Sequence, residues 1–405
     1  MIDRDQAAAT AASLATRLTI PAQSELGQTV QSLADGAAGI ALLHAERAHA
    51  SAERWEPVQT WLTAATSGHV SVAMDSSLYA GAPAVAFALH TAAGQSRRYT
   101  TARTALDQAV ATIAHRRVDA ANARIDRGEP GRFTEYDVIS GLTGIGAHLL
   151  AHTPGDDALG RILAYLVRLT TPLNLGGEEL PGWWCSHDPS QGNAPEFAGG
   201  HANLGMAHGA AGPLALLALA ARAGIHVDGQ TDAISRLSAF YDRWRQDSPA
   251  GPFWPQWITR ANQHSAAPAQ PGPGRPSWCY GTPGIARALQ LAGLATGDTT
   301  RQNSAEQALA ACIADSTQLA HLTDAGLCHG WAGLYQTVTR AAADATTDTL
   351  SRHLPTLAAF LLLSAPSTSG RAAGLLEGDT GIALVLHSVA TGTPATGWDR
   401  CLLIH

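Results

Sequence analysis

A glycine pattern, Gly-x-x-Gly, recurs along the whole chain and constrains its fold more than any other feature. Six copies are complete and one has alanine at its second glycine position; they begin at Gly36, Gly81, Gly141, Gly209, Gly281, Gly330 and Gly378. The copies are about 45 to 72 residues apart, which is too long for a regular helical solenoid but suits a pair of helices with a loop. One Gly-x-x-Gly alone is weak evidence, whereas a series of them indicates a repeated structural unit.

Two kinds of helical segment alternate with these glycines. Each copy precedes a stretch that is apolar nearly all round, such as 213–217 and 382–386, as expected of a helix buried on every side. More polar, amphipathic segments lie between them, such as 232–245 and 304–315. The alternation predicts an all-α fold, an α/α toroid of seven inner and seven outer helices that forms a single domain over residues 1–405. We expect the first glycine of a copy to adopt a positive φ and the second to allow close backbone approach.

Composition excludes several classes of protein. The chain has 405 residues, 45% of them hydrophobic, and a formal net charge of -7, which argues against binding to nucleic acid. No run approaches the roughly 18 apolar residues of a transmembrane segment, and the polar N-terminus has no apolar signal core. Five cysteines in 405 residues are sparse and odd in number, so a disulfide framework is not expected. These features predict a cytoplasmic protein in which Cys185, Cys312 and Cys401 are ordinary core residues.

Cysteine and histidine residues occupy equivalent positions in three consecutive copies. Cys279 and Cys328 stand two residues before the first glycine, and His208 and His329 stand one residue before it. If the copies are equivalent, these four side chains emerge at the same rim. Two thiolates and an imidazole suit Zn²⁺ and leave a fourth coordination position open. The sequence therefore predicts one zinc ion per chain, with Cys279, Cys328 and His329 as its ligands.

The chain resembles the lanthipeptide cyclases, the LanC family, from about Gly36 to His387. The resemblance rests on the repeated glycines and on three motifs: Trp-Cys-Tyr-Gly at 278–281, Cys-His-Gly at 328–330 and Asn-Leu-Gly-Met-Ala-His-Gly at 203–209. It implies a seven-fold α/α toroid with a central zinc. It also implies an enzyme that adds peptide cysteines to dehydroalanine or dehydrobutyrine, giving lanthionine and methyllanthionine thioethers.

The resemblance also assigns roles to four further residues. His208 corresponds to the family's catalytic histidine and Asp137 to its acidic partner, while Arg275 and Tyr280 correspond to polar residues that flank the metal. Each has a plainer interpretation. His208 would then be a core histidine with satisfied hydrogen bonds, Asp137 a capping residue, Arg275 a solvated loop charge and Tyr280 a packing residue at the rim.

The predicted function is that of a stand-alone, zinc-dependent cyclase in lantibiotic biosynthesis. It would act on a dehydrated precursor peptide with a leader, after a separate dehydratase. In such an addition the thiolate attacks the β-carbon, and the resulting enolate needs a proton and a donor for its oxyanion. Two alternatives stay open: an enzyme that adds glutathione or another small thiol to dehydroamino acids, and a non-catalytic toroid that acts as a scaffold for a dehydratase.

One segment is unusually basic for this chain. Residues 96–132 contain eight arginines, Arg97, Arg98, Arg103, Arg116, Arg117, Arg124, Arg127 and Arg132. The resemblance places an insertion here, so we interpret the segment as a docking surface for the leader peptide. The alternative is a helical pair with a solvated face.

Overall fold

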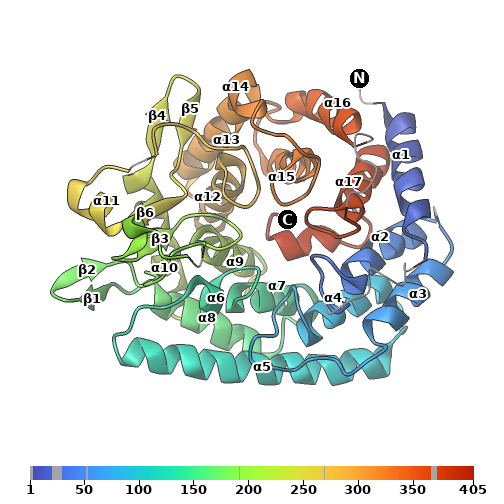
Figure 1. Cartoon of the computed structure of the whole chain (residues 1–405), viewed down its shortest axis with the longest axis horizontal. Coiled ribbons are helices and arrows are strands. Elements are labelled where there is room, and N and C mark those ends of the chain that lie inside the picture. Colours follow the sequence, from blue (N-terminus) through green and yellow to red (C-terminus); the bar gives the residue numbers. More distant parts are fainter. Residues whose placement is uncertain (1–2, 21–29, 52, 191, 269, 366–371) are drawn as a thin grey trace. The chain divides into compact units, whose positions relative to one another are not determined.

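The computed structural model describes residues 3–20, 30–51, 53–190, 192–268, 270–365 and 372–405. These ranges contain seventeen α-helices and only short strands, so the predicted all-α class is confirmed (Figure 1). The chain separates into two compact units. Unit 1 comprises residues 1–113 and 322–402, and unit 2 comprises residues 114–321 and 403–405.

None of the helices in the described ranges combines the length and apolar character that spanning a membrane requires.

Unit 1 is built from four inner helices, α2, α4, α15 and α17, that are buried nearly all round. Helix α17 packs on α2, so the last copy of the repeat lies beside the first (Figure 1). Helices α1, α3 and α16 pack on α17, α2 and α15 respectively. The elements are α1 (Arg4–Arg17), α2 (Ala37–His49), α3 (Glu56–Ala65), α4 (Ala82–Ala93), α15 (Trp331–Asp344), η2 (Ser351–His353), α16 (Leu354–Ser364), α17 (Asp379–Thr391) and η3 (Trp398–Leu402). Neighbouring first and last copies are what a closed series of repeats requires.

Unit 2 contains the other three inner helices, α7, α9 and α12, which pack on the amphipathic helices α8, α10 and α13. Its helices are α6 (Phe133–Tyr136), α7 (Leu142–His152), α8 (Asp157–Leu169), η1 (Pro195–Phe197), α9 (Ala211–Arg222), α10 (Gln230–Trp244), α11 (Arg260–Ser265), α12 (Thr282–Thr296), α13 (Thr299–Ala314) and α14 (Ser316–Leu319). Helix α5 (Thr100–Asp126) begins in unit 1 and ends in unit 2.

Six short strands interrupt the helices of unit 2 and form three antiparallel pairs, β1 with β2, β3 with β6, and β4 with β5. They are β1 (Leu173–Leu175), β2 (Glu178–Leu180), β3 (His201–Asn203), β4 (Gln246–Ser248), β5 (Gly251–Phe253) and β6 (Trp257–Thr259). The β3–β6 pair places Asn203 opposite Trp257. This pair therefore fixes the backbone just before the 203–209 motif.

The repeated glycines are needed for close approach rather than for unusual backbone angles. Gly281 and Gly330 have φ of -89° and -112°, which any residue adopts, so the expected positive φ is wrong there and in most other copies. Instead, a Cβ at Gly281 would lie 2.2 Å from the backbone nitrogen of Ser277, and one at Gly284 would lie 2.0 Å from the carbonyl oxygen of Trp278. A side chain at either glycine would therefore collide with the turn that precedes the inner helix.

The second copy of the repeat forms its turn differently. Gly81 has a positive φ of 73°, and the backbone N–H of Ala82 donates to the carbonyl of Ser71. Ala84, which replaces the second glycine, is fully buried in α4. A buried methyl group thus stands in α4 at the position where the other copies have a glycine.

Backbone hydrogen bonds link neighbouring copies within each unit, at equivalent positions or one residue apart. In unit 2 the N–H of Val138 donates to the carbonyl of Ala207 at 3.0 Å, and the N–H of Ala207 donates to that of Cys279 at 3.2 Å. In unit 1 the N–H of Cys328 donates to the carbonyl of Leu376 at 2.8 Å. Ala207, Cys279, Cys328 and Leu376 all stand two residues before a first glycine. Within each unit, the repeat register thus fixes which residues lie along this edge.

Candidate functional site

His208 and Asp137 form a close pair in unit 2. The imidazole Nδ1 lies 2.5 Å from Asp137 Oδ2, and the other carboxylate oxygen accepts the backbone N–H of Ser140 at 2.7 Å. Burial raises the pKa of Asp137, while its hydrogen bonds to His208 and to backbone N–H groups act in the opposite direction. With Nδ1 donating to the carboxylate, Nε2 is the ring nitrogen left for another partner. The side chain of His208 is 29% exposed, so this nitrogen belongs to a group that solvent reaches.

Aromatic rings hold the His208 imidazole from two sides. The ring centroid of Phe133 lies 5.1 Å away and that of Tyr280 lies 6.2 Å away. Phe133 opens the short helix α6, whose end at Tyr136 presents Asp137 immediately afterwards. The short helix therefore supplies both the carboxylate partner and one packing surface of the histidine.

Cys279 and Tyr280 occupy the turn before α12. Cys279 is only 8% exposed, and its Sγ lies 3.5 Å from Ser277 Oγ. The hydroxyl of Tyr280 accepts a hydrogen bond from Asn203 Nδ2 at 3.0 Å, and burial raises the pKa of Tyr280 to about 12. A Cβ at Gly205 would lie 2.6 Å from the Cys279 carbonyl oxygen and 2.7 Å from the Tyr280 ring. Gly205 is thus required for the motif at 203–209 to lie against this turn.

Cys328 and His329 occupy the corresponding turn of unit 1, before α15. Cys328 is half-buried, and the side chain of His329 is 31% exposed. Two carboxylates flank the imidazole: Asp324 Oδ2 is 3.6 Å from Nε2, and Glu377 Oε1 is 3.9 Å from Nδ1. Asp324 is itself oriented, because its Oδ1 accepts the N–H of Gly326 at 2.9 Å. In a metal-binding histidine one ring nitrogen binds the metal and the other donates to a carboxylate or carbonyl, and either of these two carboxylates could be that partner.

The cysteines divide into two groups by environment. All five are free thiols. Burial raises the pKa of each thiol of Cys185, Cys312 and Cys401 to about 12, which confirms them as inert core residues. Cys279 and Cys328 instead occupy equivalent turns that precede inner helices. Together with His329 they offer two sulfurs and one nitrogen, a donor set that fits Zn²⁺.

Arg275 lies at the surface of unit 2. Its side chain is exposed, and its carbonyl oxygen accepts the N–H of Ser277 at 2.9 Å in the turn that leads to Cys279. A position beside the developing oxyanion stays a prediction for this residue.

Sequence reasoning did not single out Asn203, Asp324 and Glu377. The signal was present in the register of the repeat. Asn203, Arg275 and Asp324 each stand six residues before a first glycine, and Glu377 stands one residue before Gly378. Polar residues at these two positions lie next to the turn of Cys279 in unit 2 and next to the turn of Cys328 and His329 in unit 1.

Two further histidines pack near His208. The His187 ring lies 4.8 Å from that of Phe133 and 5.9 Å from that of His201. His201 is fully buried, which lowers its pKa to about 4, so it is neutral at physiological pH. His201 thus packs against His187, whose ring in turn packs against Phe133 beside His208.

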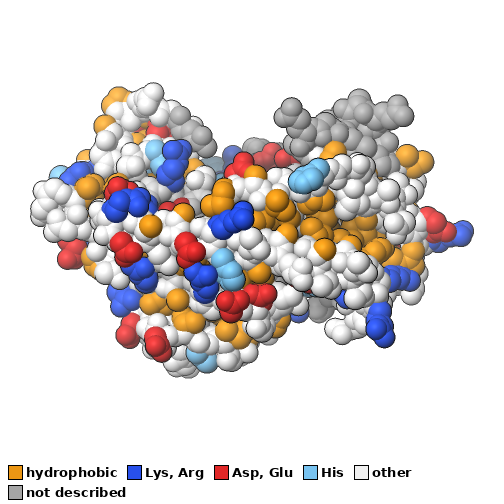
Figure 2. Space-filling view, turned by 90° about the horizontal axis from the view of Figure 1, so that it is seen from below, with side chains coloured by type: hydrophobic (Ala, Val, Ile, Leu, Met, Phe, Trp, Pro, Cys, Tyr) orange, Lys and Arg blue, Asp and Glu red, His pale blue; other side chains and the backbone are white. Residues whose placement is uncertain are grey.

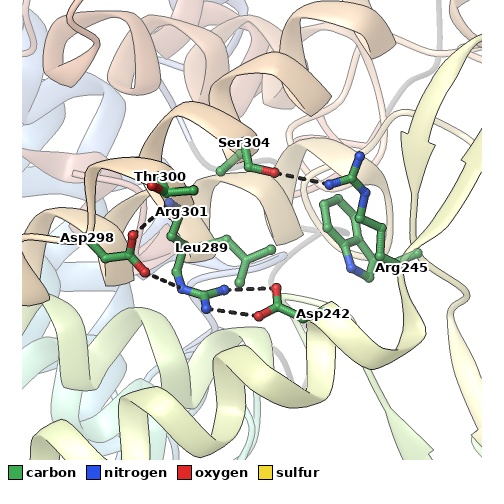
Figure 3. Close-up of a pocket in the computed structure, with 9 residues that line it drawn as sticks. Asp242, Arg245, Leu289, Asp298, Thr300, Arg301 and Ser304 are labelled. Carbon is green, nitrogen blue, oxygen red and sulfur yellow. Dashed lines mark hydrogen bonds and ion pairs between the residues drawn. The ribbon is translucent and has the colours of Figure 1, made fainter.

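A surface pocket of about 170 Å³ lies among α10, α12 and α13 (Figure 3). Arg301 dominates it, donating hydrogen bonds to both carboxylate oxygens of Asp242 at 3.0 and 2.9 Å and lying 3.5 Å from Asp298. Arg245 donates to Ser304 on its far side. Because the charged groups of this pocket satisfy one another, we interpret it as a helix-packing network.

Both arginines and acidic residues of the basic segment 96–132 form ion pairs, among them Arg127 with Glu129. Arg124 is buried and donates to Glu135, and the acidic residues Asp119 and Asp126 of the same helix pair with arginines of α8. On the face shown in Figure 2, basic and acidic side chains are interspersed. These contacts favour the solvated-helix interpretation, and a leader-docking role for the segment stays a prediction.

Known proteins define the class to which this fold and these motifs belong. The family model for lanthionine synthetase C-like proteins matches residues 27–403, and the chain therefore belongs to that family. The nisin biosynthesis protein NisC of Lactococcus lactis subsp. lactis is 24% identical over 334 residues, which cover 81% of this chain and 77% of that protein. A solved structure of nisin cyclase matches with a TM-score of 0.80 at 21% identity, covering 93% of this chain and 92% of that one. This likeness in fold confirms the predicted α/α toroid class.

Proposed function

We propose that this protein is a zinc-dependent lanthipeptide cyclase that forms thioether rings in a dehydrated precursor peptide. The observation that carries the proposal is the 2.5 Å contact between His208 Nδ1 and the buried carboxylate of Asp137, in the copy of the repeat just before the Cys279 turn. Membership of the lanthionine synthetase C-like family and similarity to a nisin biosynthesis protein support it. A dehydratase would supply the substrate, because the proposed reaction consumes dehydrated residues.

Cys279, Cys328 and His329 are the proposed ligands of the zinc ion. When bound, the zinc would lower the pKa of an incoming cysteine thiol and keep its sulfur nucleophilic. One ring nitrogen of His329 would bind the zinc, and Asp324 or Glu377 would accept the N–H of the other.

His208 carries the proton in the proposed reaction. The thiol gives its proton to Nε2, the sulfur forms a bond to the β-carbon of the dehydroamino acid, and the π electrons move to the α-carbon and its carbonyl. Nε2 then returns a proton to the α-carbon, so nothing leaves and the atoms balance. Asp137 stabilises the transient imidazolium, while Tyr280 and Arg275 are the proposed donors to the enolate oxygen.

The proposal is tested by metal content and ring formation together. The purified protein should contain about one zinc per chain, as a single three-ligand site implies. Cys279→Ala and His329→Ala should lose both the zinc and the cyclisation of a dehydrated precursor. Because cyclisation leaves the mass unchanged, free thiols are counted by alkylation and mass spectrometry. Cys312→Ala, at a buried cysteine of α13, is the matched control and should retain both properties. Wild-type cyclisation by the zinc-free protein would contradict the proposal.

The same assay separates the small-thiol alternative. With glutathione present, an enzyme of that kind would add the mass of glutathione to the dehydrated peptide in proportion to enzyme concentration. A cyclase instead removes alkylatable peptide thiols without adding mass. A scaffold would do neither.

A further inference from the structure

Asn203 is a fully buried residue whose side chain reaches Tyr280. It ends strand β3, opposite Trp257 of β6, and the ring centroid of Trp257 lies 5.8 Å from that of Tyr280. A Cβ at Gly209 would lie 2.5 Å from the Asn203 side-chain oxygen. The glycine after His208 is therefore also what makes room for this amide.

The orientation of the Asn203 amide is determined by its surroundings. Its Oδ1 accepts the backbone N–H of Gly205 at 3.0 Å, and a backbone N–H can only donate. The amide nitrogen must consequently face the Tyr280 hydroxyl, 3.0 Å away. An amide NH₂ can likewise only donate, so the phenolic oxygen is the acceptor of this hydrogen bond. The proton of the hydroxyl then points away from Asn203.

We propose that Asn203 is a positioning residue that makes Tyr280 a hydrogen-bond donor toward the reacting peptide. It does so by occupying a lone pair of the phenolic oxygen, which leaves the O–H directed elsewhere. The inference rests on the proposed cyclase function and deepens it. Tyr280 donates without giving up its proton, and the recipient is the enolate oxygen that forms when sulfur adds to the β-carbon.

Two contacts restrict the Tyr280 ring to this arrangement. The Gly205 backbone lies against the ring, since a Cβ there would approach Tyr280 Cδ1 to 2.7 Å. Trp257 packs near it at an interplanar angle of 55°. The indole N–H of Trp257, which can only donate, also acts on the Tyr280 hydroxyl. With the ring confined and both neighbours donating, the hydroxyl proton is directed away from them, and Asn203 supplies the 3.0 Å contact.

A double-mutant cycle tests the inference. Asn203→Asp has nearly the same shape but replaces the donor with an acceptor, which would capture the Tyr280 proton. We expect Asn203→Asp to lower kcat for cyclisation by about tenfold, the worth of one hydrogen bond to a charged group, with little change in KM. In the Tyr280→Phe background the same substitution should change kcat less than about twofold, because the hydroxyl through which it acts is absent. If the effects of the two substitutions on kcat instead multiply independently, or if Asn203→Asp changes KM rather than kcat, the inference is wrong.

The matched control is Asn262→Asp, at another buried asparagine of unit 2 whose amide donates to the carbonyl of Ala267. This variant should cyclise at the wild-type kcat, and a similar loss there would count against a specific role for Asn203.

A measurement independent of activity covers variants that fail to fold. In wild-type protein labelled with ¹⁵N-asparagine, the Asn203 side-chain NH₂ resonance, assigned by its loss in Asn203→Ser, should shift in Tyr280→Phe. An unchanged resonance would overturn the hydrogen bond on which the inference depends. If that resonance does shift but wild-type protein fails to cyclise any dehydrated peptide, the cyclase function is what fails.

Discussion

At the scale of single residues, the His208 pair gives the most direct prediction. In Asp137→Asn, the Ser140 N–H continues to hold the side-chain oxygen, so the amide NH₂ faces Nδ1. That donor forces the proton onto Nε2 and removes the base. We expect Asp137→Asn and His208→Asn each to lower kcat by about 100-fold or more, with zinc content unchanged, measured by single-turnover cyclisation and metal analysis.

Asp156→Asn is the matched control for that pair, because Asp156 is also in unit 2 and its side chain accepts the N–H of Ala158 as the N-cap of α8. Full activity in Asp137→Asn would contradict the prediction and would support the plainer interpretations, in which Asp137 is a capping residue and His208 a core histidine.

His201 predicts a dependence of stability on pH. Burial is the largest cause that lowers its pKa from 6.5 to about 4, with a smaller contribution from His187. The unfolded chain therefore binds more protons than the folded one between these values, and the free energy of unfolding falls as pH drops from about 6.5 to 4. The loss is at most about 3 kcal/mol. Urea unfolding at pH 7.0 and 4.5 measures it.

His201→Phe should flatten this part of the pH profile, whereas His226→Phe, at an exposed histidine of the same unit, should leave it in place. Equal slopes in wild type and His201→Phe would refute the assignment.

The chemistry-bearing residues were largely predictable from the sequence, but their supports were not. Counting from the repeated glycines placed Cys279 and Cys328 at one position and His208 and His329 at another. Asn203 escaped because an asparagine has no distinctive chemistry until its partners are known. Only the structure shows that its oxygen is held by Gly205 and that its nitrogen faces Tyr280.

At the scale of elements, two glycine-to-alanine substitutions distinguish the steric effect of an added methyl group from its effect on helix propensity. Gly284→Ala would place a Cβ 2.0 Å from the Trp278 carbonyl oxygen, and we expect it to reduce the free energy of unfolding by about 3 kcal/mol or more. Gly160→Ala, inside α8 with nothing within 4 Å of its Cβ, should increase it by about 0.5 to 1 kcal/mol. Chemical denaturation of both variants checks the signs. A loss at Gly160→Ala as large as that at Gly284→Ala would contradict the prediction, because the close approach to the Trp278 carbonyl would then not explain the cost at Gly284.

The helices were predictable because they are long and strongly patterned. The segments expected at 232–245 and 304–315 correspond to α10 at Gln230–Trp244 and α13 at Thr299–Ala314. The three-residue strands were not foreseen, since a period of two cannot be recognised over so few residues. The expected positive φ at the first glycines was wrong because sequence alone does not distinguish a glycine needed for its angles from one needed for its size.

At the scale of the whole molecule, zinc is expected to contribute to stability. Cys279 belongs to unit 2, and Cys328 and His329 belong to unit 1. If all three bind the ion only in the folded chain, free zinc at about a thousand times its Kd raises the free energy of unfolding by about 4 kcal/mol. Removing zinc with a chelator should therefore lower the Tm by several degrees in calorimetry, and adding zinc should restore it. The Tm of Cys279→Ala should respond to neither treatment. An unchanged wild-type Tm after verified metal removal would exclude this linkage.

The packing of α1 on α17 also has a consequence for biosynthesis. Arg17 of α1 pairs with Asp379 of α17 across 362 residues of sequence, whereas unit 2 is almost continuous in the chain. On the ribosome, unit 2 emerges with nearly all of its own partners and folds first. The apolar face of α1 stays without its partner α17 until the last repeat has been translated. In this interval the nascent N-terminal helices expose alanine- and leucine-rich surfaces, and they are the part of the chain on which chaperones would act.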